Sequence, residues 1–388
     1  MNFPLASRLS QIAPFHVMEL IKMAAELEQA GRSIIHMGIG EPDFPTAQPV
    51  LDAAAVALAQ GKTRYTPATG LPELRQAISQ HYRDHFAVDV APERIIITAG
   101  ASAALLLACA ALVEPGSEIL MPDPCYPCNR HFVAAFEGVA KLLASGPDES
   151  FQLSAAMVNA HWGPNTRGVL LASPSNPTGT SIDPAELAAI LAHVRAHQGF
   201  AVVDEIYQGL TYDAPPFTAL TMGEDVIAIN SFSKYFNMTG WRLGWLVVPP
   251  AMVAAVEKLA QNMFICASSI AQHAALACFT PEATQIFEER KQEFRRRRDF
   301  IVPALRELGF SVPVTPDGAF YVYADCSALS EDADALTRDI LHQAGVVLVP
   351  GLDFGPHTAH NYIRVSYATS MENLHEAVRR LQVYFRDR

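Results

Sequence analysis

Short apolar runs alternate with longer amphipathic stretches over much of the chain. The runs are too short for helices and too continuous for half-exposed strands, which is typical of strands buried on both faces of a parallel sheet. They lie near residues 94–98, 119–121, 169–172, 200–203 and 226–229. Helical patterns at 100–113 and 184–197 follow two of them, so the sequence predicts an α/β fold with a mostly parallel sheet.

The pattern changes towards the C-terminus. A long helical pattern at 281–308 is followed by a mixture of apolar runs and helices, which indicates a smaller α+β unit. The apolar runs lie at 319–323, 346–349 and 362–367, and the helices at 333–344 and 371–385.

The N-terminal stretch predicts a helix at 15–30 and a short strand at 34–37. A chain of 388 residues is long for a single small core. We therefore expect a large domain over 45–275 and a smaller domain made of 1–44 and 276–388.

Composition limits the partners of this chain. Its net charge of −12 at pH 7 would repel nucleic acids and anionic membrane surfaces. No apolar run reaches the roughly 18 residues that span a bilayer, and the first residues lack the pattern of a signal peptide. We expect a cytoplasmic protein with small-molecule partners, no nucleic acid and no membrane.

Two local features are expected to be structural. The basic run 295–298 lies in a helical pattern with several glutamates, so we expect ion pairs along a solvated helix face. Cys125 and Cys128 have the spacing of a redox or zinc half-site, but no second pair completes a set of ligands. We expect no metal, and six reduced cysteines.

Lys234 lies in a polar stretch between two apolar runs, 226–229 and 245–248. A lysine that is held out of water loses proton affinity and becomes a free amine, which can condense with an aldehyde. This stretch therefore indicates covalent chemistry at Lys234.

Other polar residues stand at or near the ends of predicted strands. Asp204 follows an apolar run, and a buried carboxylate is costly unless it meets a cation. The small-residue turn at 99–104 leads from a strand into a helix and can cradle an anion. Tyr126 follows another strand and is placed to stack on a flat ring. Arg364 lies within an apolar run and suits a carboxylate.

These motifs resemble those of the fold-type I pyridoxal-phosphate (PLP) enzymes, and within them the class I and II aminotransferases. The resemblance covers nearly the whole chain. It implies a PLP-dependent transferase with a mostly parallel seven-stranded sheet in the large domain. The lysine motif S-x-S-K-x-x-x-x-x-G-x-R-x-G matches at Ser231, Ser233, Lys234, Gly240, Arg242 and Gly244.

The resemblance implies that Lys234 forms the Schiff base with PLP and carries a proton during catalysis. It also implies a set of contacts to the cofactor phosphate. These contacts are assigned to Gly100, Ala101, Ser102, Ser231, Ser233 and Arg242.

Contacts to the cofactor ring are implied by three further matches. Asn176 in S-N-P-T-G and Tyr207 in D-E-x-Y would bind the phenolic oxygen, and Asp204 would bind the protonated ring nitrogen. Tyr126 would stack on the ring. The resemblance also implies a cis peptide bond between Asn176 and Pro177.

Substrate contacts are implied for Arg364, which would hold the α-carboxylate, for Asn176 and for Gly40, whose segment would lie over the substrate. Tyr65 would reach across the interface of a homodimer to the phosphate of the partner's cofactor. Simpler interpretations exist for four of these residues. Gly40 would form an ordinary glycine turn, Tyr65 and Tyr126 would only pack in their loops, and Arg364 would form a structural salt bridge.

The resemblance implies transfer of the α-amino group of an L-amino acid to a 2-oxo acid such as 2-oxoglutarate or pyruvate, by a ping-pong mechanism. The alternatives are a C–S β-lyase or another eliminating or cyclising enzyme on the same fold, and a PLP-sensing regulator. The substrate side chain stays open. Arg130 is a candidate reader of a distal carboxylate, whereas the apolar Val17 and Met18 suit a neutral or aromatic side chain.

Overall fold

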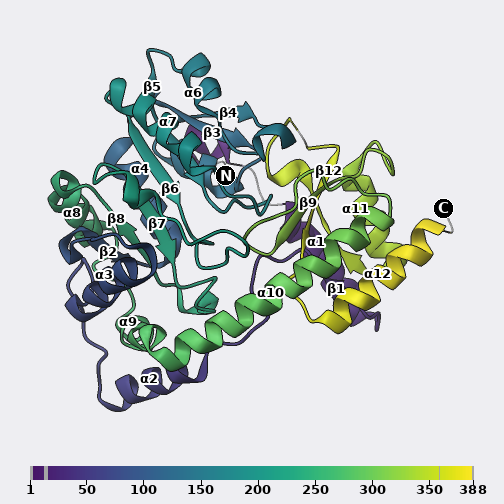
Figure 1. Cartoon of the computed structure of the whole chain (residues 1–388), viewed down its shortest axis with the longest axis horizontal. Helices are drawn as coiled ribbons and strands as arrows, with labels where there is room; N and C mark the ends of the chain where they lie inside the picture. The colour runs from purple at the N-terminus through teal and green to yellow at the C-terminus, as the bar shows by residue number, and fades with distance from the viewer. Residues whose placement is uncertain (1–2, 13–15, 358, 387–388) are drawn as a thin grey trace.

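The computed structural model describes residues 3–12, 16–357 and 359–386, and Figure 1 shows a larger and a smaller lobe. None of the helices in these three ranges combines the length and the apolar character needed to cross a bilayer.

The larger lobe is built on a seven-stranded sheet with the order β2-β8-β7-β6-β5-β3-β4. Neighbouring strands are parallel except that β8 runs antiparallel to both β2 and β7. This confirms the predicted α/β fold with a mostly parallel seven-stranded sheet. The strands are β2 (Ile95–Thr98), β3 (Glu118–Asp123), β4 (Val139–Ala144), β5 (Thr166–Ala172), β6 (Phe200–Asp204), β7 (Ile227–Ser231) and β8 (Gly244–Val247).

Both faces of this sheet are covered, which explains the continuous apolar runs. On β5, Leu170 packs in the cluster that contains α4, α5 and α8, whereas Val169 and Leu171 pack against α6 and α7 on the opposite face. The covering helices are α4 (Gly100–Leu112), α5 (Pro127–Ala135), α6 (Ala155–His161), α7 (Pro184–Ala196) and α8 (Val253–Met263).

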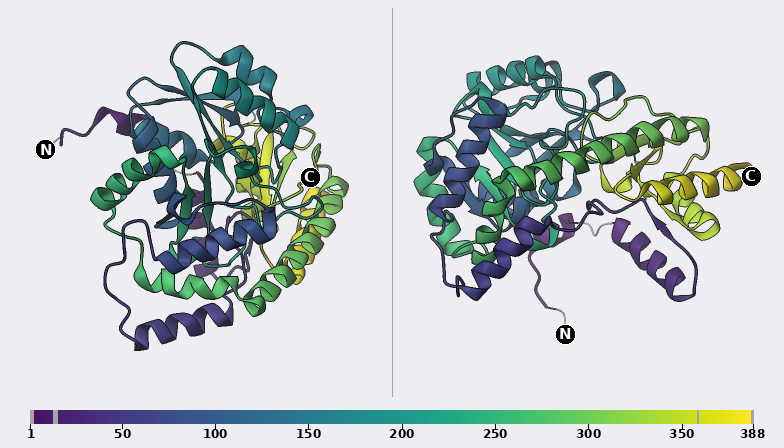
Figure 2. Two further views of the ribbon diagram at one scale, coloured as in Figure 1. Left: turned by 60° about the vertical axis from the view of Figure 1, so that its left-hand side comes forward. Right: turned by 60° about the horizontal axis from the view of Figure 1, so that its bottom comes forward.

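A further layer of helices packs beside β2 and β8. Helix α2 (Gln48–Ala59) lies against α9 (Ser269–Ala275), and α3 (Pro72–Phe86) contacts β2. Figures 1 and 2 show α2 and α9 side by side at one end of the larger lobe.

The smaller lobe holds two short sheets. An antiparallel sheet has the order β11-β12-β9, and a parallel pair joins β1 to β10. One strand was predicted at 346–349, but the chain changes partner at Leu348, so this stretch forms two strands. The elements are α1 (His16–Gln29), β1 (Ile35–His36), β9 (Tyr321–Asp325), α11 (Ala333–Ala344), β10 (Val346–Val347), β11 (Val349–Pro350), β12 (Tyr362–Ser366) and α12 (Met371–Arg386).

Helix α10 (Pro281–Glu307) runs from the larger lobe along the smaller one, as Figures 1 and 2 show. It carries the basic run 295–298, and the expectation of a solvated face is wrong for Arg297 and Arg298, which are 3% and 5% exposed. The predicted i,i+4 pairing is present between Arg297 and Glu293, and Arg298 pairs with the neighbouring Asp299. Each arginine also pairs with an aspartate from a distant segment, Asp43 or Asp213, which the spacing along one helix could not reveal. Such pairing offsets the cost of removing the charges from water.

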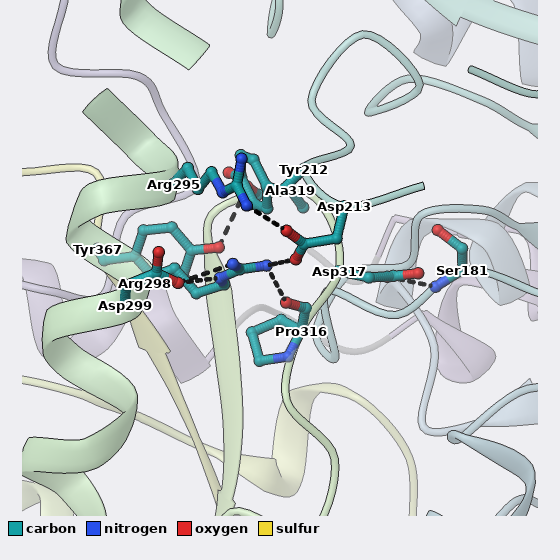
Figure 3. A network of polar contacts seen from close by, with 10 residues as sticks. All are labelled: Ser181, Tyr212, Asp213, Arg295, Arg298, Asp299, Pro316, Asp317, Ala319 and Tyr367. Atoms are coloured by element: carbon teal, nitrogen blue, oxygen red, sulfur yellow. Dashed lines mark hydrogen bonds and ion pairs between the residues drawn. The ribbon is translucent and has the colours of Figure 1, made fainter. Parts of the chain in front are cut away.

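Arg298 is the centre of the network in Figure 3. Its Nη1 donates to Asp213 Oδ2 at 2.5 Å and to the Pro316 carbonyl at 3.2 Å, while Nη2 donates to Asp299 Oδ1 at 2.7 Å. Arg297 similarly donates to Asp43 at 2.7 Å. Helix α10 is thus joined to segments from several parts of the chain.

Replacing Arg298 with glutamine should lower the free energy of unfolding by about 1–3 kcal/mol, because a buried carbonyl and a carboxylate lose their donor. Arg296→Gln is the matched control: Arg296 lies in the same run, is 67% exposed and pairs only with Glu293 among the described residues. We expect it to change stability by no more than about 0.5 kcal/mol. Urea unfolding of both variants measures the difference, and equal losses would contradict the buried role of Arg298.

Candidate active site

A cavity of about 490 Å³ lies between the lobes, at the carboxyl ends of the central strands. Most of the residues that the sequence singled out line it. These are Gly40, Ala101, Ser102, Tyr126, Asn176, Asp204, Tyr207, Ser233, Lys234, Arg242 and Arg364.

Lys234 follows β7 and its amine is buried in the cavity. Its Nζ donates to the carbonyl of Gly40 at 2.5 Å. Burial lowers the pKa of Lys234 to about 8, and the nearby cations Arg364 and Arg242 act in the same direction, against the opposing charges of Glu41 and Asp204. A much larger fraction of this amine is therefore neutral near pH 7 than for an exposed lysine, which is what a nucleophile requires.

Asp204 ends β6 and is 4% exposed. Burial raises its pKa to about 6, although a hydrogen bond from the Ile206 N–H to Oδ1 at 3.1 Å and the charge of Lys234 oppose the shift. Tyr207 lies one turn further on, and its hydroxyl is 2.8 Å from that of Tyr321. A buried carboxylate of this kind fits a cationic ring nitrogen.

The start of α4 forms an anion cradle with Arg242. Its N-cap, Ala99, provides no side-chain hydrogen bond, so the first backbone N–H groups stay available. Gly100 has φ +77°, and a Cβ there would lie 2.7 Å from Nη2 of Arg242.

Two buried hydroxyls complete this region. Ser231 Oγ lies 2.9 Å from Ser233 Oγ and accepts the Ser233 N–H at 3.1 Å. Ser233 lines the cavity, whereas Ser231 and Gly100 are not among its lining residues. Hydroxyls, free N–H groups and a guanidinium together fit a phosphate group.

Arg364 projects from β12 with its guanidinium between the rings of Tyr321 and Phe354, at 4.6 and 4.9 Å. Nη1 donates to Asn176 Oδ1 at 2.8 Å and Nη2 to the Gly38 carbonyl at 2.6 Å. Its Nε is buried without a partner, and among the described residues no carboxylate pairs with the guanidinium. This leaves a buried cation whose pairing with a ligand carboxylate would remove an unsatisfied donor.

The loop that follows β5 brings Asn176 to Arg364, and the Asn176–Pro177 bond is cis, as expected. Tyr126 precedes α5 and lines the cavity, where burial raises the pKa of its hydroxyl. Gly40 lies so close to Tyr321 that a Cβ would be 2.4 Å from its hydroxyl oxygen.

Two candidates lie away from the cavity. Tyr65 is 81% exposed and does not line the cavity of its own chain. Arg130 points its Nη2 at the carbonyl of Asp353, at 2.8 Å, and is not part of the lining. The cysteines Cys125 and Cys128 are free thiols, and the described residues hold no group of three or more His, Cys, Asp or Glu that could bind a metal.

Several cavity residues were missed by the sequence analysis. Tyr321 and Phe354 flank Arg364, while Ile39 and Glu41 extend the Gly40 segment into the lining. The aromatic residues lie in apolar stretches that are indistinguishable from core sequence. The positions of Ile39 and Glu41 next to Gly40 offered a signal, since the segment was already expected to lie over the substrate.

The fold and the site define a PLP enzyme of the aminotransferase type, and the chain belongs to the aminotransferase class I and II family, whose sequence model matches residues 32–381. A valine–pyruvate aminotransferase of Mycobacterium tuberculosis is 38% identical over 95% of this chain and 96% of the relative. An aspartate/prephenate aminotransferase of Thermus thermophilus is 36% identical over 97% of each chain.

Solved structures agree. The crystal structure of an aminotransferase from Mycobacterium tuberculosis matches with a TM-score of 0.96 and 37% identity over 100% of both chains. An aspartate aminotransferase from Thermus thermophilus with maleate matches with a TM-score of 0.92 and 34% identity, over 98% of this chain and 99% of that one. The protein is therefore a PLP-dependent aminotransferase, which moves an amino group to a 2-oxo acid.

The raised pKa of Asp204 has a consequence for stability without cofactor. A raised carboxyl pKa means that the folded state holds a proton that the unfolded state has lost, so stability falls as the pH rises from about 4 to about 6 and is constant above that. Asp204→Asn removes this loss. We therefore expect the free energy of unfolding of the cofactor-free variant to exceed that of the parent by about 1–3 kcal/mol at pH 7.5.

Urea unfolding of cofactor-free protein at pH 5 and pH 7.5 measures this effect, and the gap between variant and parent should be wider at pH 7.5. With PLP bound, we expect the parent to have the higher free energy of unfolding, because the ring cation would then pair with the carboxylate. A gap that does not depend on pH would contradict the shifted pKa.

Proposed function

We propose that Lys234, Asp204 and Tyr207 are the catalytic residues of this aminotransferase. The observation that carries the proposal is the buried amine of Lys234, with a pKa near 8, in the same cavity as the buried Asp204 carboxylate and the unpaired Nε of Arg364. These groups offer a nucleophile, an anion for a ring cation and a cation for a substrate carboxylate.

Each group then has one task. Lys234 would hold the cofactor, and its amine would take up and return the proton at the substrate Cα. When bound, PLP supplies an acceptor for the electron pair that this proton leaves behind. Asp204 keeps the ring nitrogen protonated, and Tyr207 and Asn176 donate to the phenolic oxygen.

Binding is divided between two ends of the cavity. At one end, the cofactor phosphate would be bound by the amides of Gly100, Ala101 and Ser102 and by the side chains of Ser231, Ser233 and Arg242, and Tyr126 would pack against the ring. At the other end, Arg364 binds the α-carboxylate of the amino acid or the 2-oxo acid beneath the Gly40 segment. Since both substrates use this end in turn, the kinetics are ping-pong.

We also propose that the active form is a homodimer in which Tyr65 serves the partner's cofactor. Large apolar side chains are exposed on α2 and at and just after the end of α8, and a second copy of the chain would cover them. They are Leu51, Val56, Leu58, Met263 and Ile265.

The loop of Tyr65 is fixed to this apolar region. Ser269 of α9 donates to the Arg64 carbonyl at 2.6 Å, and Gln272 donates to Thr66 Oγ1 at 3.0 Å. Since α9 packs on α2, Tyr65 stands beside the surface that the second copy would cover. This placement supports a contact made in trans.

We further propose that the lobes correspond to domains with the boundaries 45–275, and 1–44 with 276–388. A reducing compartment such as the cytoplasm is supported by the six cysteines, which are all free thiols.

Reduction with borohydride tests the assignment of Lys234. In the parent holoenzyme it should fix the cofactor to the tryptic peptide that contains Lys234, because only a covalent linkage is trapped. Lys234→Ala should show neither this label nor conversion of the cofactor by amino acids. Lys258→Ala, on the exposed side of α8, is the matched control and should keep both. A label on any other lysine would refute the assignment.

Mixed dimers test the shared site. When Lys234→Ala chains are combined with Tyr65→Phe chains, a tyrosine that acts in trans restores one complete site per mixed dimer. Such dimers should retain PLP more tightly than the Tyr65→Phe homodimer, by about 1.5–3 kcal/mol for a hydrogen bond to a charged group. Retention at limiting cofactor is the measurement, and retention equal to that of the homodimer would end the proposal.

A further inference from the structure

The segment Gly38–Ile39–Gly40 connects the two groups that would hold a substrate. The carbonyl of Gly38 accepts Nη2 of Arg364 at 2.6 Å, and the carbonyl of Gly40 accepts Nζ of Lys234 at 2.5 Å. Ile39 lies between these two contacts and its side chain lines the cavity. A side chain on the Cα of a substrate held by Arg364 and Lys234 therefore lies close to Ile39.

Ile39 is the one residue of this segment that can offer a side chain. A Cβ at Gly40 would lie 2.4 Å from the hydroxyl oxygen of Tyr321, and a Cβ at Gly38 would lie 3.0 Å from Val347 Cγ1. A side chain at Gly40 would therefore require Tyr321 to move, and one at Gly38 would crowd Val347. The surface that the segment presents to the cavity is apolar.

Helix α1 extends this apolar surface. Val17, Met18 and Ile21 line the same cavity. With Ile39 they form what we call the apolar seat, and no residue of the seat carries a charge or a hydrogen-bonding side chain.

Two carboxylates border the apolar seat. Asp353 is 3% exposed and accepts the backbone N–H groups of His16 and Val17 at 2.8 and 2.9 Å. The beginning of α1, which could otherwise attract an anion, is therefore occupied by an acid of the protein itself. Glu41 also lines the cavity and accepts the hydroxyl of Thr239.

The proposed function assigns a role to every cation of the cavity lining. Among the described residues, the lining contains three: Lys234, Arg242 and Arg364. Lys234 and Arg242 would hold the cofactor, and Arg364 would bind the α-carboxylate. Arg130 is outside the lining: its Nη2 donates to the carbonyl of Asp353, and its Nη1 is buried without a partner.

We propose that this site takes amino acids with uncharged, apolar side chains, and that Asp353 and Glu41 disfavour aspartate and glutamate. The proposal rests on the roles proposed above for Lys234 and Arg364. A second carboxylate on the substrate would be removed from water without a cation to receive it and would face two acids. Because donor and acceptor use the same site, a monocarboxylic 2-oxo acid such as pyruvate is the matching acceptor.

The test is conversion of the bound cofactor of the holoenzyme, followed by absorbance, with alanine, valine, leucine, methionine, aspartate and glutamate. We expect kcat/KM for leucine or methionine to be about 100-fold higher than for aspartate and glutamate. In the reverse half-reaction, kcat/KM should be higher for pyruvate than for 2-oxoglutarate. A preference for aspartate or glutamate, or for 2-oxoglutarate, would overturn this proposal and leave the proposed function intact. Failure of every amino acid would instead overturn the proposed function as well.

Variants locate the source of the preference. Ile39→Ala should lower kcat/KM for leucine by about tenfold or more and change that for alanine much less, since a shortened seat affects only long side chains. Glu41→Gln should raise the ratio of aspartate to leucine about two- to fivefold. Glu19→Gln is its matched control, because Glu19 lies on α1 outside the cavity and should leave the ratio unchanged.

Asp353→Asn should raise the same ratio, and circular dichroism checks that the helix it caps persists. If that helix is lost, the ratio of aspartate to leucine in Glu41→Gln is the measurement that decides. Equal ratios in Glu41→Gln, Glu19→Gln and the parent, together with equal losses for leucine and alanine in Ile39→Ala, would overturn the assignment of specificity to these residues.

Discussion

The cost of holding cations out of water governs the arrangement of this site. Lys234 shares its cavity with Arg242 and Arg364, and each of these charges adds to the effect of burial by lowering the pKa of Lys234. Asp204 and Glu41 oppose the shift. Two backbone carbonyls of the N-terminal segment each accept a hydrogen bond from these cations: Gly40 accepts from Lys234, and Gly38 accepts from Arg364.

The same constraint couples cofactor and substrate recognition. Asn176, to which the proposed function assigns a cofactor contact, lies in the loop after β5 and accepts a hydrogen bond from Arg364, which comes from the smaller lobe. Because Arg364 has an unpaired Nε, a carboxylate that binds there changes the balance of charge around Lys234 as well. If Arg364 binds the substrate carboxylate as proposed, substrate binding and the reactivity of the amine would be linked through charge.

Much of this could be predicted from the sequence, because strands buried on both faces produce continuous apolar runs and because Lys234, Asp204 and Arg364 lie in recognisable local motifs. Features that depend on distant partners could not. The break at Leu348 arises because two different sheets pair with adjacent residues, and the burial of Arg298 depends on Asp213, which comes from another segment. Local spacing contains no information about such partners.

The N-terminal segment explains why the two lobes act as one site. Beyond Gly40 it stays attached to the loop that carries Lys234: Thr46 donates to the carbonyl of Asn237 at 3.1 Å and accepts from Trp241 at 2.9 Å. Arg290 of α10 bridges Asn237 and the carbonyl of Pro45 in the same region. The carbonyls that position Lys234 and Arg364 are thus held by the lysine loop and by the long helix together. Any motion between the lobes must therefore carry this segment along or break its contacts with the lysine loop.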